Sequence, residues 1–285
     1  MFLKLSQAAL ATLCVLGGFQ FPAAVAADSQ VYHFSPVNQY GINLTAAYWN
    51  PIINYVTEKS GVKLVLKIGR TSADTTSYVL ANEVEFVFTN HLFSPEREQL
   101  GWKVFGRRDT PPVHGQIIVA DDSPVKKLQE LTGHDVAFPG PEALIAYKFP
   151  YAHLLSQGVD VKVVFGGNQD GALAQLYSGK VKAVGGNSQL LEGYAKRESK
   201  KYRVLWSSEP LYDLALMASS NVPERDRKAV ADAFLGMAKD ARGREVLSTA
   251  SAAVGLPVTT AFIPSSGTEY GAYRKFYQSA PTNLR

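Results

Sequence analysis

Polar side chains follow most of the predicted β-strands, each at the point where the strand ends. Amides, hydroxyls and a few charged groups of this kind can hydrogen-bond a small polar solute. Asn and Ser also favour loops and helix caps for local reasons, so recurrence at many strand ends, rather than any one position, favours a ligand site. The candidate binding residues are Asn38, Tyr40, Arg70, Thr71, Ser72, Asn90, His91, Pro141, Glu142, Ala143, Asn168 and Asn187.

The stretch from Gly133 to Gly158 carries the strongest local signal of a binding site. Its apolar run, residues 134–138, predicts a strand, and Pro141 suits the first position of a following helix. Pro150 should kink that helix. A helix that starts here would direct free backbone N–H groups beyond the end of the strand, where they could bind an anion or a polar ligand. An ordinary β-α unit of a parallel sheet is the alternative interpretation.

Two charged candidates leave the charge of the ligand open. Arg70 has the only fixed positive charge in the candidate set. It could pair with an anion or could be a solvated surface arginine. Glu142 suits the dipole of a helix start, yet it would repel an anion bound to the same N–H groups. It could instead hold the amino group of a zwitterionic ligand.

The sequence predicts no catalytic residue, no cofactor and no metal site. The five histidines are scattered and form no H-E-x-x-H motif. Phosphate-binding G-x-x-x-x-G-K-[ST], dinucleotide-binding G-x-G-x-x-G and nucleophile-elbow G-x-S-x-G motifs are absent. The excess of 29 Lys and Arg over 25 Asp and Glu is too small to indicate a nucleic-acid partner. We therefore expect a binding protein rather than an enzyme.

The first 27 residues have the pattern of a secretory signal peptide. Lys4 precedes an apolar run over residues 8–21, and small residues place the cleavage site near Ala26 or Ala27. Cys14, the single cysteine, lies within this segment, so the mature chain is expected to have no disulfide. No second hydrophobic span follows. We therefore expect an exported, soluble protein of the periplasm.

The elements that would position the candidate residues alternate as β-α-β-α-β and then begin a second β-α series. The expected strands are residues 32–34, 62–68 and 85–89 in the first series and 134–138, 161–165, 181–184 and 204–206 in the second, with crossing strands at 114–120 and 214–218. This order predicts a two-lobed α/β fold, each lobe a mostly parallel sheet flanked by helices, with two interlobe crossings. Lobe 1 would comprise residues 28–117 and 220–285, and lobe 2 residues 118–219. Ligands bind such folds at the carboxyl ends of the strands, between the lobes.

Several short segments carry a resemblance to a known family. They are Tyr48-Trp49-Asn50-Pro51-Ile52 with Tyr55 and Gly61, residues 80–86, residues 128–133 before Val136-Ala137-Phe138, Phe165-Gly166-Gly167-Asn168, and residues 181–184. In this order and spacing they extend over nearly the whole mature chain. The chain resembles the periplasmic binding proteins of phosphate, phosphite and phosphonate ABC importers, the PhnD-like group with a type II binding-protein fold.

This resemblance implies a monomeric solute-binding component of an ABC importer. It would close its lobes on a phosphate- or phosphonate-type oxyanion, or on a related zwitterion, and present the closed form to a membrane permease. An extracytoplasmic sensor of the same fold, which signals to a membrane histidine kinase, is the alternative interpretation. An enzyme built on this scaffold is a third.

The residues at the family's ligand positions differ in this chain. The family usually has a tyrosine near the end of the third strand, where this chain has Asn90, His91 and Phe93. It often has a Ser-Thr-Ser-like run at the helix start of the second lobe, where this chain has residues 140–143, Gly-Pro-Glu-Ala. Asn168 and Asn187 stand where the family has a histidine and an aspartate. The resemblance therefore extends further over the scaffold than over the ligand contacts.

Overall fold

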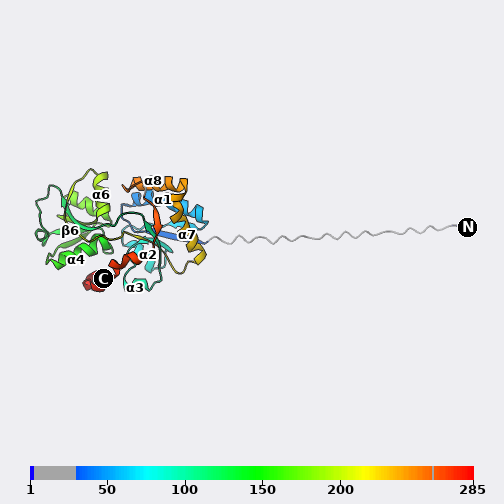
Figure 1. Cartoon of the computed structure of the whole chain (residues 1–285), viewed down its shortest axis with the longest axis horizontal. Helices are drawn as coiled ribbons and strands as arrows, with labels where there is room; N and C mark the ends of the chain where they lie inside the picture. The colour runs from blue at the N-terminus through cyan, green and yellow to red at the C-terminus, as the bar shows by residue number, and fades with distance from the viewer. Residues whose placement is uncertain (3–29, 259) are drawn as a thin grey trace.

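The computed structural model describes residues 1–2, 30–258 and 260–285, and its helices and strands form two lobes, each built around a β-sheet (Figure 1). The predicted signal peptide, residues 1–27, lies outside the described residues except for Met1 and Phe2. No helix among the described residues has the length and apolar character needed to span a bilayer.

The first lobe contains a six-stranded sheet and the second a five-stranded sheet. The order in the first is β11-β4-β10-β3-β1-β2 and in the second β7-β6-β8-β5-β9. The first sheet consists of β1 (Val31–Pro36), β2 (Lys63–Leu66), β3 (Phe86–Thr89), β4 (Lys103–Arg108), β10 (Ala215–Ala218) and β11 (Phe262–Pro264). The second consists of β5 (Gly115–Ala120), β6 (Asp135–Phe138), β7 (Lys162–Phe165), β8 (Ala183–Asn187) and β9 (Tyr202–Ser207). The sequence pattern does not reveal β4 and β11.

Both sheets are mixed, which corrects the prediction of mostly parallel sheets. β1 pairs in parallel with β2 and β3, and β6 pairs in parallel with β7 and β8. β10 is antiparallel to β3 and β4, and β5 is antiparallel to β8 and β9. β5 and β10 enter their sheets directly from the other lobe. A strand runs parallel to its neighbour when a crossover, usually a helix, carries the chain back to the same end of the sheet. No such helix precedes β5 or β10. The two-lobed α/β class itself is confirmed.

Helices cover both sheets. Those of the first lobe are α1 (Ile42–Ser60), α2 (Asp74–Leu80), α3 (Pro95–Glu98), α7 (Glu224–Gly236) and α8 (Ala241–Ala253), and those of the second are α4 (Phe149–Ser156), α5 (Gln169–Tyr177) and α6 (Ser188–Arg197), while α9 (Gly271–Ser279) follows at the C-terminal end. Shorter helical turns are η1 (Leu128–Leu131), η2 (Leu144–Lys148), η3 (Met237–Lys239), η4 (Thr268–Tyr270) and η5 (Thr282–Leu284). α1 continues through Pro51, so this proline does not mark its start, and the helix ends at Gly61 in the left-handed conformation, as predicted.

An aromatic core holds the first lobe together. Trp49 of α1 lies against Phe34 of β1 and Phe88 of β3, at ring-centroid distances of 4.8 and 5.1 Å. Phe34 also contacts Phe234 of α7, and all four side chains are buried. Because this cluster packs on β1 and β3, it fixes the ends of the strands that carry the chain to the interlobe cleft.

The C-terminal helix α9 contacts both lobes. Phe276 of α9 lies 4.5 Å from Phe149 of α4, and Tyr270, just before α9, stacks on Phe93 of the first lobe at 4.6 Å. The sequence predicts that the helices after residue 220 rejoin the first lobe. α7 and α8 do so, whereas α9 spans the junction.

Two extended segments connect the lobes and pair with each other. Val113 and Leu211 exchange two backbone hydrogen bonds of 2.7 Å each. β5 lies wholly in the second sheet and β10 wholly in the first. The crossings therefore lie between β4 and β5 and between β9 and β10, a few residues ahead of the predicted lobe boundaries at 117 and 219. Paired connections of this kind can absorb a hinge motion.

Candidate functional site

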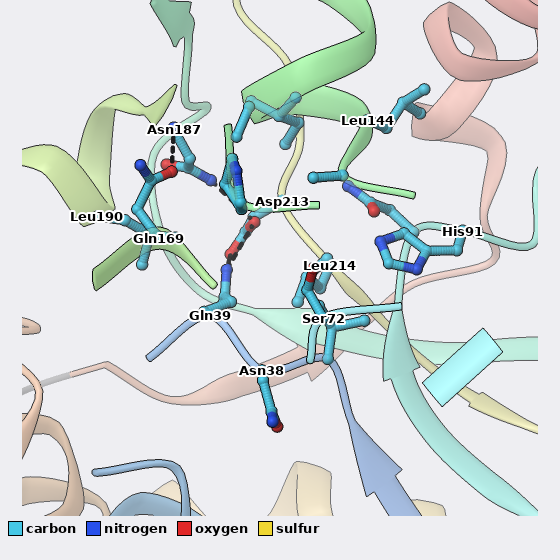
Figure 2. A pocket seen from close by; sticks show the side chains of 16 residues that line it. Asn38, Gln39, Ser72, His91, Leu144, Gln169, Asn187, Leu190, Asp213 and Leu214 are labelled. Atoms are coloured by element: carbon cyan, nitrogen blue, oxygen red, sulfur yellow. Dashed lines mark hydrogen bonds between the residues drawn. The ribbon is translucent and has the colours of Figure 1, made fainter. Parts of the chain in front are cut away.

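A small cavity lies between the lobes, beyond the carboxyl ends of β1, β3, β6 and β8 (Figure 2). Its volume is about 40 Å³. The lining residues are Val37, Asn38, Gln39, Ser72, Asn90, His91, Pro139, Ala143, Leu144, Ile145, Ala146, Gln169, Asn187, Leu190, Asp213 and Leu214. Both lobes and the returning crossover therefore contribute to the cavity.

A network of buried polar side chains centres on Asp213. The Asp213 carboxylate accepts hydrogen bonds from Gln39 Nε2 at 3.3 Å, from Asn187 Nδ2 at 3.2 Å and from an Arg108 guanidinium nitrogen at 2.5 Å. Gln169 Oε1 accepts the backbone N–H of Asn187 at 3.3 Å (Figure 2). Gln39 and Arg108 come from the first lobe and Asn187 from the second, so the network joins the lobes through a residue of the crossover.

Arg108 neutralises the charge of Asp213. The side chains of this ion pair are only 1% and 4% exposed. Burial lowers the pKa of Arg108, but the adjacent Asp213 carboxylate outweighs burial and raises this pKa above its ordinary value. The guanidinium stays charged, and the pair adds no net charge to the cavity.

His91 is a neutral side chain at physiological pH. Its ring Nδ1 lies 2.9 Å from the Thr76 hydroxyl, and the residue is 1% exposed. Burial, reinforced by the charges of Arg97 and Lys148, lowers the pKa of His91 to about 4, although Glu142 opposes the shift. The imidazole can therefore offer the cavity a polar group without a positive charge.

The helix start after β6 leaves free backbone N–H groups beside the cavity. Residues 141–143 form a turn, and helical structure begins with the π-turn η2, which continues into α4. Pro150 lacks the N–H that a regular α-helix would direct to Ala146 O, which favours a wider turn here. The backbone N–H groups of Leu144, Ile145 and Ala146 have no acceptor within the described chain, and all three residues line the cavity.

Two side-chain oxygens at the cavity are buried without a partner in the described chain. They are Asn38 Oδ1 and Ser72 Oγ. The other side-chain atom of Asn38, Nδ2, donates to Gly69 O at 2.5 Å, which fixes the orientation of the amide. Buried polar atoms are nearly always satisfied in native proteins, so the Ser72 hydroxyl indicates a place for a bound polar molecule, whereas the Asn38 side chain extends away from the other lining side chains (Figure 2).

The lobes touch beside the cavity. Ser72 N–H donates to Gly167 O across the cleft at 2.8 Å. Gly41 N–H reaches Asp170 Oδ2 in the same way at 3.4 Å. Each of these bonds joins a residue of the first lobe to a residue of the second. The structure is therefore that of a closed form.

Glu142 faces Arg97 of the first lobe instead of the cavity. Two guanidinium nitrogens of Arg97 donate to its two carboxylate oxygens at 2.5 and 2.9 Å. Burial raises the pKa of Glu142, but the bonds from Arg97 and the neighbouring positive charges outweigh it and lower the pKa to about 2. Glu142 is thus ionised and engaged within the protein.

Residues 36–270 match the model of a family described as periplasmic substrate-binding proteins of phosphonate ABC transporters. The chain belongs to this family. A comparison with curated proteins found no match.

Among the described residues, no group of three or more His, Cys, Asp or Glu side chains could hold a metal ion.

Solved structures with the same fold include members of this family. The chain is similar to PhnD1 from Prochlorococcus marinus (MIT 9301), solved in complex with methylphosphonate, at 15% identity over 88% of this chain and 98% of that chain, with a TM-score of 0.74. A binding-protein component of a phosphonate ABC transporter from Pseudomonas aeruginosa matches at 15% identity over 88% and 87% of the chains, with a TM-score of 0.75. A Xanthomonas citri protein bound to ATP matches at 16% identity over 87% and 97%, with a TM-score of 0.66.

Family membership gives the chain its general role. It is the periplasmic substrate-binding component of an ABC transporter, which binds a small-molecule solute and works with a membrane permease. The type II periplasmic binding protein fold predicted from the sequence is confirmed. The family is one of transport proteins and is not a class of enzymes.

The candidate residues predicted from the sequence divide into two groups in this family member. Asn38, Ser72, Asn90, His91, Ala143 and Asn187 line the cavity. Tyr40, Arg70, Thr71, Pro141, Glu142 and Asn168 are not among the lining residues.

Local bonds explain where most of the second group lies. Arg70 is exposed, and the Thr71 hydroxyl donates to Asp74 Oδ1 at 2.9 Å. Asn168 Oδ1 caps α5 by accepting the Gly171 N–H. Tyr40 is buried on the first-lobe side, where burial raises its pKa to about 12. Pro141 precedes the helix instead of occupying its first position, and it is exposed.

Three polar lining residues are not among the candidate binding residues. Gln39 and Gln169 belong to strand ends that the sequence predicts to face the cleft, and each directly follows a candidate residue. Asp213 lies in the returning crossover, where no strand end points to the cleft. Only the pairing of the crossovers places its carboxylate beside the carboxyl ends of the parallel strands.

Proposed function

We propose that this protein is the solute-binding component of an importer for small phosphonate-type oxyanions, which it holds in the interlobe cavity through neutral hydrogen-bond donors. The observation that carries the proposal is that residues 144–146, with free backbone N–H groups, and Ser72, with an unpartnered hydroxyl, line the same cavity from opposite lobes. Backbone N–H groups at a helix start and a hydroxyl suit the oxygens of a phosphonate.

The charges around the cavity support binding by dipoles. Asp213 is neutralised by Arg108, and His91 is uncharged at neutral pH. Arg70, the only residue of fixed positive charge among the candidates predicted from the sequence, does not line the cavity. N–H and O–H groups that line a binding site can stabilise an anion without a full positive charge, because their dipoles are fixed in place by the fold.

The size of the cavity favours a ligand of few atoms. In the closed form the cavity volume is about 40 Å³. Methylphosphonate and phosphite suit such a space, whereas 2-aminoethylphosphonate needs additional room and a partner for its amino group. Glu142, which could have served as that partner, is already bound to Arg97.

We also propose that the protein acts as a monomer and is exported by a signal peptide that is cleaved near Ala26 or Ala27. Both sides of the cavity come from a single chain, which supports a monomer. Residues 1–27 have the pattern of a signal peptide. The intact mass of the periplasmic protein tests the cleavage site, and light scattering after size exclusion tests the monomer.

Calorimetric titration of the mature protein tests the ligand class. Methylphosphonate, phosphite, phosphate and 2-aminoethylphosphonate are titrated in turn, with sulfate and glutamate as controls. We expect 1:1 binding of methylphosphonate or phosphite, and weaker or no binding of glutamate. Absence of binding with every phosphorus-containing ligand, or tight binding of glutamate, would contradict the proposed ligand class.

A further inference from the structure

An ion pair closes the cleft beside the cavity, and it joins residues of opposite lobes. Arg97 belongs to α3 of the first lobe, and Glu142 lies in the turn before η2 of the second lobe. Both guanidinium–carboxylate bonds are formed, at 2.5 and 2.9 Å. Neither residue is among those that line the cavity, and each side chain is 21% exposed.

The first lobe holds Arg97 in position for this contact. Its backbone N–H donates to Ser94 Oγ at 3.3 Å, and a guanidinium nitrogen donates to His91 O at 2.8 Å. The second bond ties the guanidinium to the backbone of His91, whose side chain lines the cavity. A guanidinium held in this way loses little side-chain entropy when a carboxylate arrives, so a two-pronged bond across a half-buried cleft is favourable.

Lys148 supplies Glu142 with a second positive neighbour from its own lobe. Lys148 is 4% exposed, and its ammonium group lies over the ring of Tyr277 at 5.0 Å from the ring centre. Its charge favours the ionised form of Glu142. When the lobes separate, Glu142 therefore keeps a cation nearby, which limits the cost of releasing Arg97. The interlobe bond can form and break without leaving an isolated carboxylate.

We propose that Arg97 and Glu142 form a latch that sets the lifetime of the closed complex without touching the solute. This inference rests on the proposed function, since it assigns how the solute is retained after the lobes close. A residue that stabilises only the closed form raises the apparent affinity for every solute that requires closure, by one common factor. A residue that contacts the ligand changes affinities selectively.

Binding measurements on Glu142→Gln and Arg97→Gln separate these two roles. The probes are methylphosphonate, phosphite and 2-aminoethylphosphonate, with dissociation rates from stopped-flow fluorescence. The latch predicts that both variants raise the dissociation rate about tenfold for each probe that binds, and that the double variant adds little further. Glu58→Gln is the matched control, because it breaks an ion pair within the first lobe, between Glu58 of α1 and Arg242 of α8. It should leave the dissociation rate of each probe unchanged. Unchanged rates, or a loss confined to the amine-bearing probe, would overturn the latch.

A distance measurement without ligand keeps this test independent of the solute. The mature chain is expected to lack cysteine, so spin labels can be attached at Asn54→Cys in α1 and Lys180→Cys in the second lobe, both exposed positions. Glu142→Gln should shift the ligand-free distance distribution toward the open form, while Glu58→Gln should not. If no phosphonate binds, the proposed ligand class fails and this measurement still decides the latch. Identical distributions for the wild type and Glu142→Gln would overturn it.

Discussion

Gly140 and Ser72 approach each other across the interlobe cleft so closely that a Cβ on residue 140 would lie 2.5 Å from Ser72 Oγ. Gly140 follows β6 in the second lobe, and Ser72 lies between β2 and α2 in the first. The contact exists only because residue 140 has no side chain. The same serine lines the cavity, so this close approach affects both a contact between the lobes and one of the candidate ligand donors.

Replacement of Gly140 by Ala should disturb the contact between the lobes at Ser72. The added methyl group would lie 2.5 Å from Ser72 Oγ, so either the hydroxyl must rotate away from its present place or the cleft must open slightly. We expect the dissociation constant for methylphosphonate to rise about tenfold or more, because donors on the two lobes no longer meet the ligand together. Calorimetric titration measures this effect. Gly41→Ala is the control, since a Cβ at residue 41 meets nothing within 4 Å, and its dissociation constant should match that of the wild type.

Replacement of Ser72 by Ala should separate binding from stability. Ser72 Oγ is buried and has no partner in the described chain, so its loss removes no internal hydrogen bond. We expect the free energy of unfolding of the ligand-free protein to stay the same or rise slightly. Loss of one hydroxyl bond to an anion should weaken binding by about 1.5–3 kcal/mol, or roughly 10- to 100-fold. Urea unfolding and calorimetry on the same sample measure both quantities. A large loss of stability with unchanged affinity would contradict the assigned role.

Replacement of Asp213 by Asn should destabilise the protein strongly. It leaves the Arg108 guanidinium buried without a counter-charge, a loss of about 3–5 kcal/mol in the free energy of unfolding. Addition of Arg108→Met to Asp213→Asn removes the unpaired buried charge and should recover part of the lost stability. Chemical denaturation of the single and double variants measures the free energy of unfolding of each. If the double variant were less stable than Asp213→Asn, the ion pair would not be the source of the loss.

His91 should make folding stability depend on pH between about 6.5 and 4. Its pKa in the folded protein is about 4, below its ordinary value of 6.5, so the unfolded chain binds more protons in this window and stability falls as the pH drops. The full loss is about 3 kcal/mol. The charged groups that influence His91 are Glu142, Arg97 and Lys148, and Glu142 titrates only below about 4.5 because its folded pKa is near 2.

His91→Asn tests this pH dependence. Urea unfolding of wild type and variant at several pH values should show that stability of the variant declines less between pH 6.5 and 4. The decline below pH 4, which comes from carboxylates such as Glu142, should remain in both proteins. Equal slopes between pH 6.5 and 4 would mean that His91 is not the responsible group.

The sequence contains enough information for the arrangement of the lobes but not for the orientation of each side chain. Alternating apolar strands and helices predict the two β-α series, and polar strand ends predict where the cleft lies. Which of two adjacent polar residues points inward depends on strand register. Asn38 and Gln39 both reach the cavity, whereas Asn168 turns to cap α5 and its neighbour Gln169 lines the cavity.

Contacts between lobes are the features that the sequence does not reveal. Glu142 looks like a ligand group because it lies at a predicted helix start, and only the closed arrangement pairs it with Arg97 of another element. Asp213 and Arg108 are 105 residues apart, and no periodic pattern links them. Arg108 lies in β4, a strand with charged residues at both ends and a glycine in the middle, which is not the apolar pattern expected of a buried strand. Such pairs form through tertiary packing, so the spacing of residues within one segment of the sequence cannot predict them.

Native mass spectrometry of the protein purified from its own periplasm tests the central claim most directly. The central claim is that the interlobe cavity holds one small phosphonate-type oxyanion. We predict a complex with one equivalent of a small phosphorus-containing acid, released on unfolding and identified by its exact mass, and a much lower occupancy in Gly140→Ala. A co-purified amino acid, sugar or other solute without phosphorus in the wild-type protein would contradict the claim.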